Sequence, residues 1–146
     1  MLELGLGSGR TFDHLRRHLP DREILVFERT ADPRLPAGPD EAHLIRGELE
    51  ETLRAARDRL PGPAVLAHSD IGTGDPARNA RVARRIAALL PAVLQPGALV
   101  ASDQPLASAR LDSVPPPASV RPGRYHLYRC AGRRAGVPNR WAVLAA

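Results

Sequence analysis

The sequence predicts a doubly wound α/β fold: a mostly parallel seven-stranded sheet with helices on both faces and an antiparallel hairpin at its C-terminal end. Over residues 1–101, short apolar runs of strand length alternate with segments of helical spacing. This alternation is typical of parallel sheets whose strands are joined by crossover helices. The last two strand-like runs are joined by a loop too short for such a helix, so they must pair antiparallel.

Seven runs predict the strands of this sheet. The parallel strands are expected at residues 1–4, 24–27, 44–45, 64–67 and 97–101. Several of these runs are continuously apolar, as in strands that are covered on both faces. Residues 125–130 and 141–144 are expected to form the hairpin, with Gly132, Gly136 and Pro138 in its loop.

Helical spacing predicts three helices between these strands. The first begins at Thr11 and ends before Pro20, the second follows Glu48 and extends to Leu60, and the third begins at Pro76. Residues 30–40 are rich in proline and glycine, so the crossover helix at that point is short or missing. The prolines at residues 115–117 exclude regular structure there.

Composition excludes several classes of protein. A chain of 146 residues is long enough for one domain with a real core. The net charge is +5, but the arginines are scattered with no long basic block, so a nucleic-acid partner is not expected. Cys130 is the single cysteine, which rules out an intrachain disulfide. With neither a signal peptide nor a membrane-length apolar run, these features favour a cytoplasmic protein.

Three glycines at alternate positions, Gly5, Gly7 and Gly9, lie between the first strand and the first helix. They let the backbone turn tightly and let a ligand lie directly against the main chain. The helix start offers N–H groups, and Glu3 at the strand end offers a carboxylate. S-adenosylmethionine suits both, because its amino-acid tail accepts hydrogen bonds and its sulfonium carries positive charge.

The turn has two other interpretations. An ordinary strand–helix connection would also contain glycines. The dinucleotide fingerprint G-x-G-x-x-G requires a third glycine at position 10 or 12, and these positions hold Arg10 and Phe12. The sequence therefore disfavours a dinucleotide. Glu28 follows the second strand at the spacing where nucleotide-binding folds place an acid on ribose hydroxyls, and the alternative is a solvated strand-end acid.

The segments Leu-Glu-Leu-Gly-Leu-Gly-Ser-Gly-Arg-Thr, from Leu2, and His-Ser-Asp-Ile-Gly, from His68, carry a resemblance to a known family. They resemble the class I S-adenosylmethionine-dependent methyltransferases, whose first motif reads acidic-x-Gly-x-Gly-x-Gly. Within that class they look like a small bacterial group of S-adenosylmethionine methyltransferases. The resemblance covers nearly the whole chain. It implies a single Rossmann-like, S-adenosylmethionine-binding methyltransferase domain over residues 1–146, with a reversed last strand.

The resemblance also implies a set of cofactor-binding residues. Glu48 would meet the exocyclic amine of adenine and the backbone N–H of Leu49 a ring nitrogen, although Glu48 is equally suited to the start of a helix. The residues expected to bind the cofactor are Glu3, Gly5, Leu6, Gly7, Ser8, Gly9, Arg10, Thr11, Glu28, Arg29, Glu48, Leu49 and Asp70.

The implied activity is methyl transfer to a small-molecule acceptor by in-line displacement, a reaction that depends chiefly on aligning the reactants. His68 and Asp70 follow the fourth strand and are the candidate catalytic residues, as bases for an acceptor that must lose a proton. His68 could also be a partly buried strand-end histidine. Asp70 and Asp103 resemble the carboxylates that hold Mg²⁺ in catechol-type O-methyltransferases. No third ligand is evident, so we expect no metal requirement.

Two features depart from the family: the short crossover after the second strand, and a chain that starts inside the first strand, without the usual N-terminal helices. We therefore expect either a longer chain or a partner subunit, such as a second copy in a homodimer, to close the cofactor cleft. Two alternative functions stay open. One is a non-catalytic cofactor-binding or interaction protein of the same fold, and the other is a nucleotide-dependent oxidoreductase.

Overall fold

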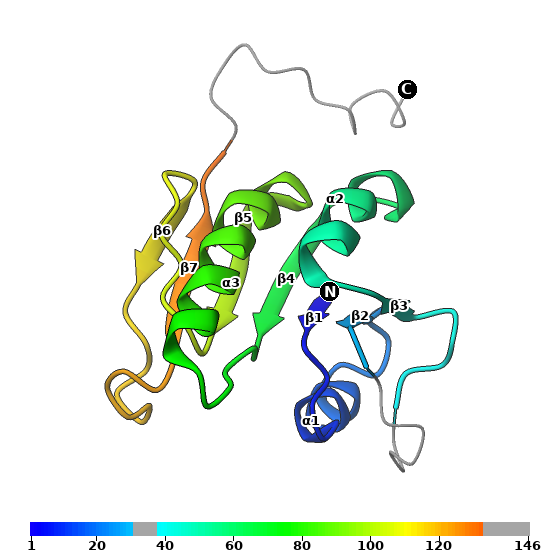
Figure 1. The fold of residues 1–146 in the computed structure, drawn as a ribbon, viewed down its shortest axis with the longest axis horizontal. Coiled ribbons are helices and arrows are strands. Elements are labelled where there is room, and N and C mark those ends of the chain that lie inside the picture. The colour runs from blue at the N-terminus through cyan, green and yellow to red at the C-terminus, as the bar shows by residue number, and fades with distance from the viewer. Residues whose placement is uncertain (31–37, 133–146) are drawn as a thin grey trace.

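The computed structural model describes residues 1–30 and 38–132, which form a mixed sheet with helices on both faces (Figure 1). Within these residues the sheet has seven strands in the order β3-β2-β1-β4-β5-β7-β6. The strands β1 to β5 pair in parallel, whereas β7 is antiparallel to both of its neighbours. Their bounds are β1 Leu2–Leu4, β2 Leu25–Glu28, β3 Leu44–Arg46, β4 Ala64–Ser69, β5 Leu94–Ser102, β6 Leu111–Val114 and β7 His126–Cys130. The predicted fold class is confirmed.

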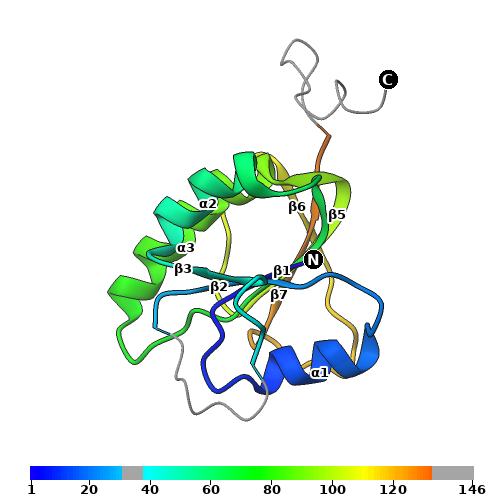
Figure 2. The same ribbon diagram turned by 90° about the vertical axis from the view of Figure 1, so that its right-hand side faces the viewer.

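Helices α2 (Leu49–Arg59) and α3 (Pro76–Leu89) lie side by side on one face of the sheet, and α1 (Arg10–His18) lies on the other (Figure 2). A short 3₁₀ turn, η1 (Leu90–Ala92), continues α3. The start of α3 follows local rules: Pro76 occupies its first turn, and the Asp75 side chain accepts hydrogen bonds from the N–H groups of Ala77 and Arg78. None of the described helices is long and apolar enough to cross a membrane.

Two apolar clusters hold the layers together. The larger one packs α2 and α3 against the sheet and includes Leu4, Phe27, Ile86 and Val100. The smaller one joins α1 to β2 through Phe12 and Val26. Because β1 lies in the middle of the sheet, its residues Leu2, Glu3 and Leu4 are all buried.

The described C-terminal strands include one that the sequence did not predict. β7 pairs with β5 on one side and with β6 on the other, where Leu111 lies opposite Cys130. The predicted run at residues 141–144 lies outside the described residues. The sequence interpretation missed β6 because it is a short edge strand in which Asp112 and Ser113 are exposed, and prolines follow it directly. The strand at residues 125–130 is confirmed as β7.

Two other boundaries can be compared. The strand expected at residues 97–101 is longer, because β5 begins at Leu94 and passes through Gly97 at a φ of 81°. The crossover between β2 and β3 was expected to be short or missing. Residues 31–37 of that crossover lie outside the described residues, and residues 38–43 contain a turn and no helix.

Candidate cofactor and active site

A cavity of about 250 Å³ opens at the carboxyl ends of the parallel strands, where doubly wound sheets bind their ligands. Segments at the ends of four strands line it: the glycine turn after β1, Glu28 and Arg29 at the end of β2, the Gly47–Leu49 segment after β3 and the Asp70–Thr73 segment after β4. A smaller cavity of about 80 Å³ adjoins the start of α1 and shares Gly5, Gly7 and Asp70 with the first.

The structure brings most of the predicted cofactor residues together around these two cavities. Those that line one or both are Gly5, Leu6, Gly7, Ser8, Arg10, Thr11, Glu28, Arg29, Glu48, Leu49 and Asp70. Gly9 caps the start of α1 from a left-handed conformation, and no side chain caps that helix. The N–H groups of its first turn are therefore open to an anionic or hydrogen-bond-accepting ligand.

Gly5 and Gly7 serve different purposes in the turn. Both have a positive φ, of 90° and 51°. A Cβ at Gly5 would lie 2.5 Å from the carbonyl oxygen of Asp70, so this position is closed by the β4–α3 loop. A Cβ at Gly7 would meet nothing within 4 Å. Gly5 thus allows two backbone segments to pack closely, while Gly7 borders the empty space of the cleft.

Glu28 is bound to the backbone of the glycine turn. Its Oε2 accepts hydrogen bonds from the N–H of Leu6 at 2.8 Å and, at 3.4 Å, of Gly7, and its Oε1 accepts one from Thr30 at 3.0 Å. Burial alone would raise the pKa of Glu28, but these backbone donors outweigh burial and hold the pKa below its ordinary value of 4.5. The three described hydrogen bonds thus occupy most of the roughly four lone-pair sites of this carboxylate.

An exposed ion pair spans the cleft beside Glu28. Arg29 follows β2 and lies 3.5 Å from the Glu48 carboxylate, which follows β3. Both side chains are more than half exposed, so the pair contributes little to stability. The pair brings Arg29 and Glu48 into contact. Both are predicted cofactor residues, and the resemblance implies that Glu48 binds the adenine ring.

Glu3 lies away from the rest of the predicted cofactor set. It is 1% exposed, and its Oε2 lies 3.0 Å from Nδ1 of His68. Neither residue lines the cavities described above. Burial would lower the pKa of His68, but the hydrogen bond to Glu3 and nearby carboxylates raise it above the ordinary value of 6.5. Burial raises the pKa of Glu3, an effect that the bond to His68 only partly offsets.

Asp103 connects the end of β5 to the β4–α3 loop. Its Oδ1 accepts a hydrogen bond from the N–H of Ile71 at 3.1 Å, and its Oδ2 accepts one from the side chain of Gln104 at 2.9 Å. Both oxygens of this carboxylate are therefore engaged by protein donors. Within residues 1–30 and 38–132, no group of at least three His, Cys, Asp or Glu side chains is placed to hold a metal ion.

The cleft has two further polar residues that the sequence interpretation did not single out. Asn79 on α3 accepts hydrogen bonds from both the N–H and the hydroxyl of Thr73, and it donates one to the Thr73 carbonyl. Asn79 is 7% exposed. The sequence does carry a signal for this pair. Thr73 lies in the loop just before the Asp75 cap of α3, and Asn79 lies in the first turn or so of that helix. The pair fixes the loop that lines one wall of the cleft.

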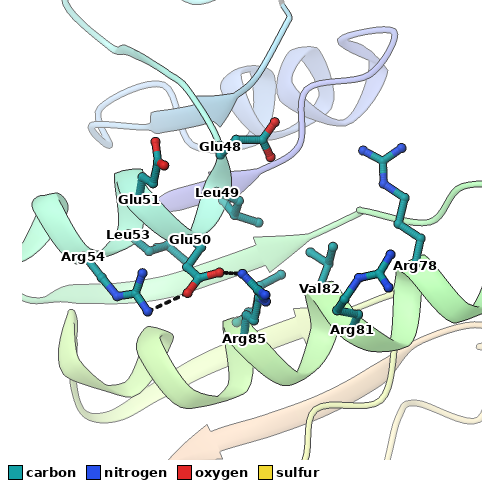
Figure 3. Close-up of a pocket in the computed structure, with 11 residues that line it drawn as sticks. Glu48, Leu49, Glu50, Glu51, Leu53, Arg54, Arg78, Arg81, Val82 and Arg85 are labelled. Carbon is teal, nitrogen blue, oxygen red and sulfur yellow. Dashed lines mark ion pairs between the residues drawn. The ribbon is translucent and has the colours of Figure 1, made fainter.

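A second groove, of about 460 Å³, lies between α2 and α3 and borders the cleft (Figure 3). Glu50 on α2 points into it and forms ion pairs with Arg54 and with Arg85 of α3. Arg78 and Val82 line both the groove and the cleft. The groove is therefore a charged extension of the cleft that is partly closed by its own ion pairs.

Comparisons with known proteins agree with this arrangement. The sequence family described as S-adenosyl-L-methionine methyltransferase matches residues 1–130. Among solved structures, the chain is similar to an S-adenosyl-L-methionine methyl transferase from Silicibacter pomeroyi DSS-3, with 40% sequence identity and a TM-score of 0.83 over 89% of this chain and 80% of that chain. A search of curated proteins finds no match.

Two other solved structures have weaker similarity. An O-methyltransferase family protein from Burkholderia thailandensis has 14% identity and a TM-score of 0.48, over 90% of this chain and 50% of that chain. A Streptococcus mutans protein in complex with SAH has 11% identity and a TM-score of 0.45, over 88% and 83%. The family match and the 40% identical structure decide the assignment, and the glycine turn, cleft and sheet order accord with it. The chain belongs to the S-adenosyl-L-methionine methyltransferase family and is an S-adenosyl-L-methionine-dependent methyltransferase.

Proposed function

We propose that the cleft at the carboxyl ends of β1 to β4 binds S-adenosyl-L-methionine and that the protein transfers its methyl group to a small-molecule acceptor. The observation that carries this proposal is the open space at Gly7, directly beside the ionised Glu28 carboxylate. A ligand can lie against the backbone there because no side chain fills the space. The domain proposed for this activity is residues 1–146.

The residues present suit the different parts of this cofactor. Glu28 is proposed to accept hydrogen bonds from the ribose hydroxyls, while Glu48 and the N–H of Leu49 bind the adenine ring beside Arg29. The turn from Gly5 through Leu6, Gly7, Ser8 and Gly9 to Arg10 and Thr11 is proposed to hold the amino-acid tail at the start of α1. Asp70 lines both cavities and is proposed to lie beside the same tail.

When bound, the cofactor supplies a methyl group on a sulfonium: the acceptor's lone pair forms the new bond to carbon, and the carbon–sulfur pair stays on sulfur to leave a neutral thioether. The chain's contribution is to hold the acceptor in line, an effect that reaches about 7–11 kcal/mol in well-oriented reactions. For an acceptor that must lose a proton, His68 and Asp70 are the proposed bases. No metal is proposed to take part.

We also propose a homodimer. Val100 of β5 packs into the cluster under α2 and α3, so its neighbour Leu99 points to the opposite face. Leu99 is 45% exposed there, and β7 places Arg129 opposite it in the sheet. The cluster of α1 is built on β2, away from this part of the sheet. A second copy of the chain would cover Leu99.

Isothermal calorimetry with S-adenosylhomocysteine and with NAD, in the presence of excess EDTA, tests the cofactor proposal. We expect S-adenosylhomocysteine to bind with a Kd on the order of 1 μM, about −8 kcal/mol, and NAD not to bind. Binding should be unchanged by EDTA, because the proposed contacts involve no metal. Tight NAD binding with no heat from S-adenosylhomocysteine would overturn the proposal.

A further inference from the structure

Glu3 and His68 form a buried pair because β1 and β4 are neighbours in the sheet. The register places the two residues directly opposite each other, and Oε2 of Glu3 lies 3.0 Å from Nδ1 of His68. The side chain of Glu3 is 1% exposed and that of His68 is 11% exposed. Glu3 is thus the inner member of the pair, and His68 is the less deeply buried one.

The hydrogen bond determines which nitrogen of His68 can act as a base. With Glu3 ionised, its carboxylate only accepts, and Nδ1 then carries the proton that it donates to Glu3. In neutral imidazole the other nitrogen, Nε2, then has a free lone pair. No hydrogen bond to Nε2 is present within the described part of the chain, and the ring of Tyr125 lies nearby, 6.1 Å away between centroids.

We propose that Glu3 is a positioning residue rather than a cofactor ligand: its carboxylate holds His68 as the Nδ1–H tautomer, so that Nε2 takes the proton of the methyl acceptor. This inference rests on the proposed function. It identifies the acceptor class as a group that carries a proton before methylation, a hydroxyl or an ammonium. The proton passes from the acceptor to Nε2, and the imidazolium that forms is stabilised by the adjacent Glu3 carboxylate.

Burial would lower the pKa of His68, but the carboxylates around the ring raise that pKa above its ordinary value of 6.5. The charged or titratable groups that face it are Glu3 from β1, Asp70 from the end of β4, Asp103 from the end of β5 and Tyr125 just before β7. All three carboxylates favour the imidazolium, and burial opposes it. Glu3 has the largest effect among the carboxylates because it alone is hydrogen-bonded to the ring.

Nuclear magnetic resonance of the ligand-free chain, labelled with ¹⁵N-histidine, tests the pair without a substrate. His68→Asn identifies the signals of His68. We expect neutral His68 to carry its proton on Nδ1 and its pKa to lie above 6.5. Glu3→Gln should lower the proton affinity of His68 roughly tenfold or more, a shift of about one pKa unit. Asp13→Asn removes an exposed carboxylate of α1 and should leave His68 unchanged.

A second measurement separates this inference from the proposed function. We expect Glu3→Gln to bind S-adenosylhomocysteine within threefold of the unaltered chain, because a positioning residue for the base does not hold the cofactor. A loss of more than tenfold would make Glu3 a cofactor ligand and overturn the inference. Failure of the unaltered chain to bind S-adenosylhomocysteine would instead refute the proposed function.

The tautomer decides the question even if Glu3→Gln does not fold. A proton on Nε2 of neutral His68 in the unaltered chain would overturn the inference by itself, and so would an unchanged pKa in a folded Glu3→Gln. Once an acceptor is found, Glu3→Gln should lower kcat far more than it raises KM, and the limb of the pH profile due to His68 should move to lower pH. Glu3→Asp should restore part of kcat.

Discussion

Two glycines of one turn, Gly5 and Gly7, are expected to respond in opposite ways to an added side chain. Gly7→Val should lower the affinity for S-adenosylhomocysteine below detection, because a branched side chain would occupy the open space of the cleft. The positive φ adds a backbone cost of about 1–2 kcal/mol, so the variant should still fold. Calorimetry and thermal unfolding measure the two effects.

Matched variants separate two effects of a substitution at Gly7: the filling of the cleft by the new side chain and the backbone strain at a positive φ. Gly7→Ala puts a Cβ at the same positive φ without a branch, and should bind more weakly than the unaltered chain but measurably. Gly5→Ala should instead lower Tm most, because its Cβ would collide with the Asp70 carbonyl. Equal affinities for Gly7→Val and the unaltered chain would place the ligand elsewhere.

Glu28 combines a proposed ligand contact with a structural one. Glu28→Ala would leave the N–H groups of Leu6, Gly7 and Thr30 without their acceptor, at a cost of about 1–3 kcal/mol. For a chain of this size each kcal/mol lowers Tm by roughly 2–4 °C. We therefore expect both Tm and cofactor affinity to fall. An unchanged Tm would contradict the hydrogen bonds described for the turn.

The stabilisation of the fold by Glu28 should decrease as the pH falls. Because the folded-state pKa is below 4.5, its stabilisation is present above that unfolded-state value and is lost as the pH falls through the folded-state pKa. The free energies of unfolding of the unaltered chain and of Glu28→Gln should therefore differ at neutral pH and converge in acid. Chemical denaturation at several pH values below 5 would measure this convergence.

At the scale of elements, α3 and the loop before it form one unit of the cleft wall. Asn79→Ala would leave Thr73 without three hydrogen bonds, so the loop should loosen and affinity for S-adenosylhomocysteine should fall about tenfold or more. Asp75→Ala removes only the helix cap and should cost about 0.5–2 kcal/mol of stability with little change in affinity. If the two variants lose affinity for S-adenosylhomocysteine equally, the hydrogen bonds between Asn79 and Thr73 do not contribute specifically to ligand binding.

The strands differ in how well they can be predicted from the sequence. The first five were recognisable because buried parallel strands are continuous apolar runs, as in residues 24–27. The edge strand β6 was not recognisable, because Leu111–Val114 has polar residues at both of its central positions. An edge strand of this kind is determined by the backbone groups of its neighbour more than by its own side chains.

At the scale of the whole molecule, we expect a dimer in solution that depends on the open face of β5. Leu99→Glu should give a monomer in sedimentation equilibrium, because covering the new carboxylate with the second copy would remove its hydration, even with Arg129 opposite it in the sheet. An exposed substitution should alter the stability of the isolated chain by no more than about 0.5 kcal/mol. Val65→Glu, at an equally exposed residue of β4, is a comparison for added charge alone. A monomeric unaltered chain would refute the dimer.

The site was predictable where it depends on local sequence and not where it depends on pairing between distant segments. The glycine turn is continuous in sequence, and its spacing was enough to identify it. Glu3 and His68 are 65 positions apart and meet only because β1 pairs with β4 in one register. The hydrogen bonds that Leu6 and Gly7 donate to the Glu28 carboxylate likewise need the β1–β2 pairing. A one-residue change of register would separate both pairs.

The carboxylate of Glu28 also determines when the glycine turn becomes ordered. Since it already holds the N–H groups of Leu6 and Gly7, the turn is formed before any ligand arrives. A ligand then meets a preorganised surface and loses little of its binding free energy to ordering the loop. Amide hydrogen exchange at Leu6 should therefore be slow in the free protein and change little on binding, whereas in Glu28→Ala the same amide should gain protection only when the cleft is filled.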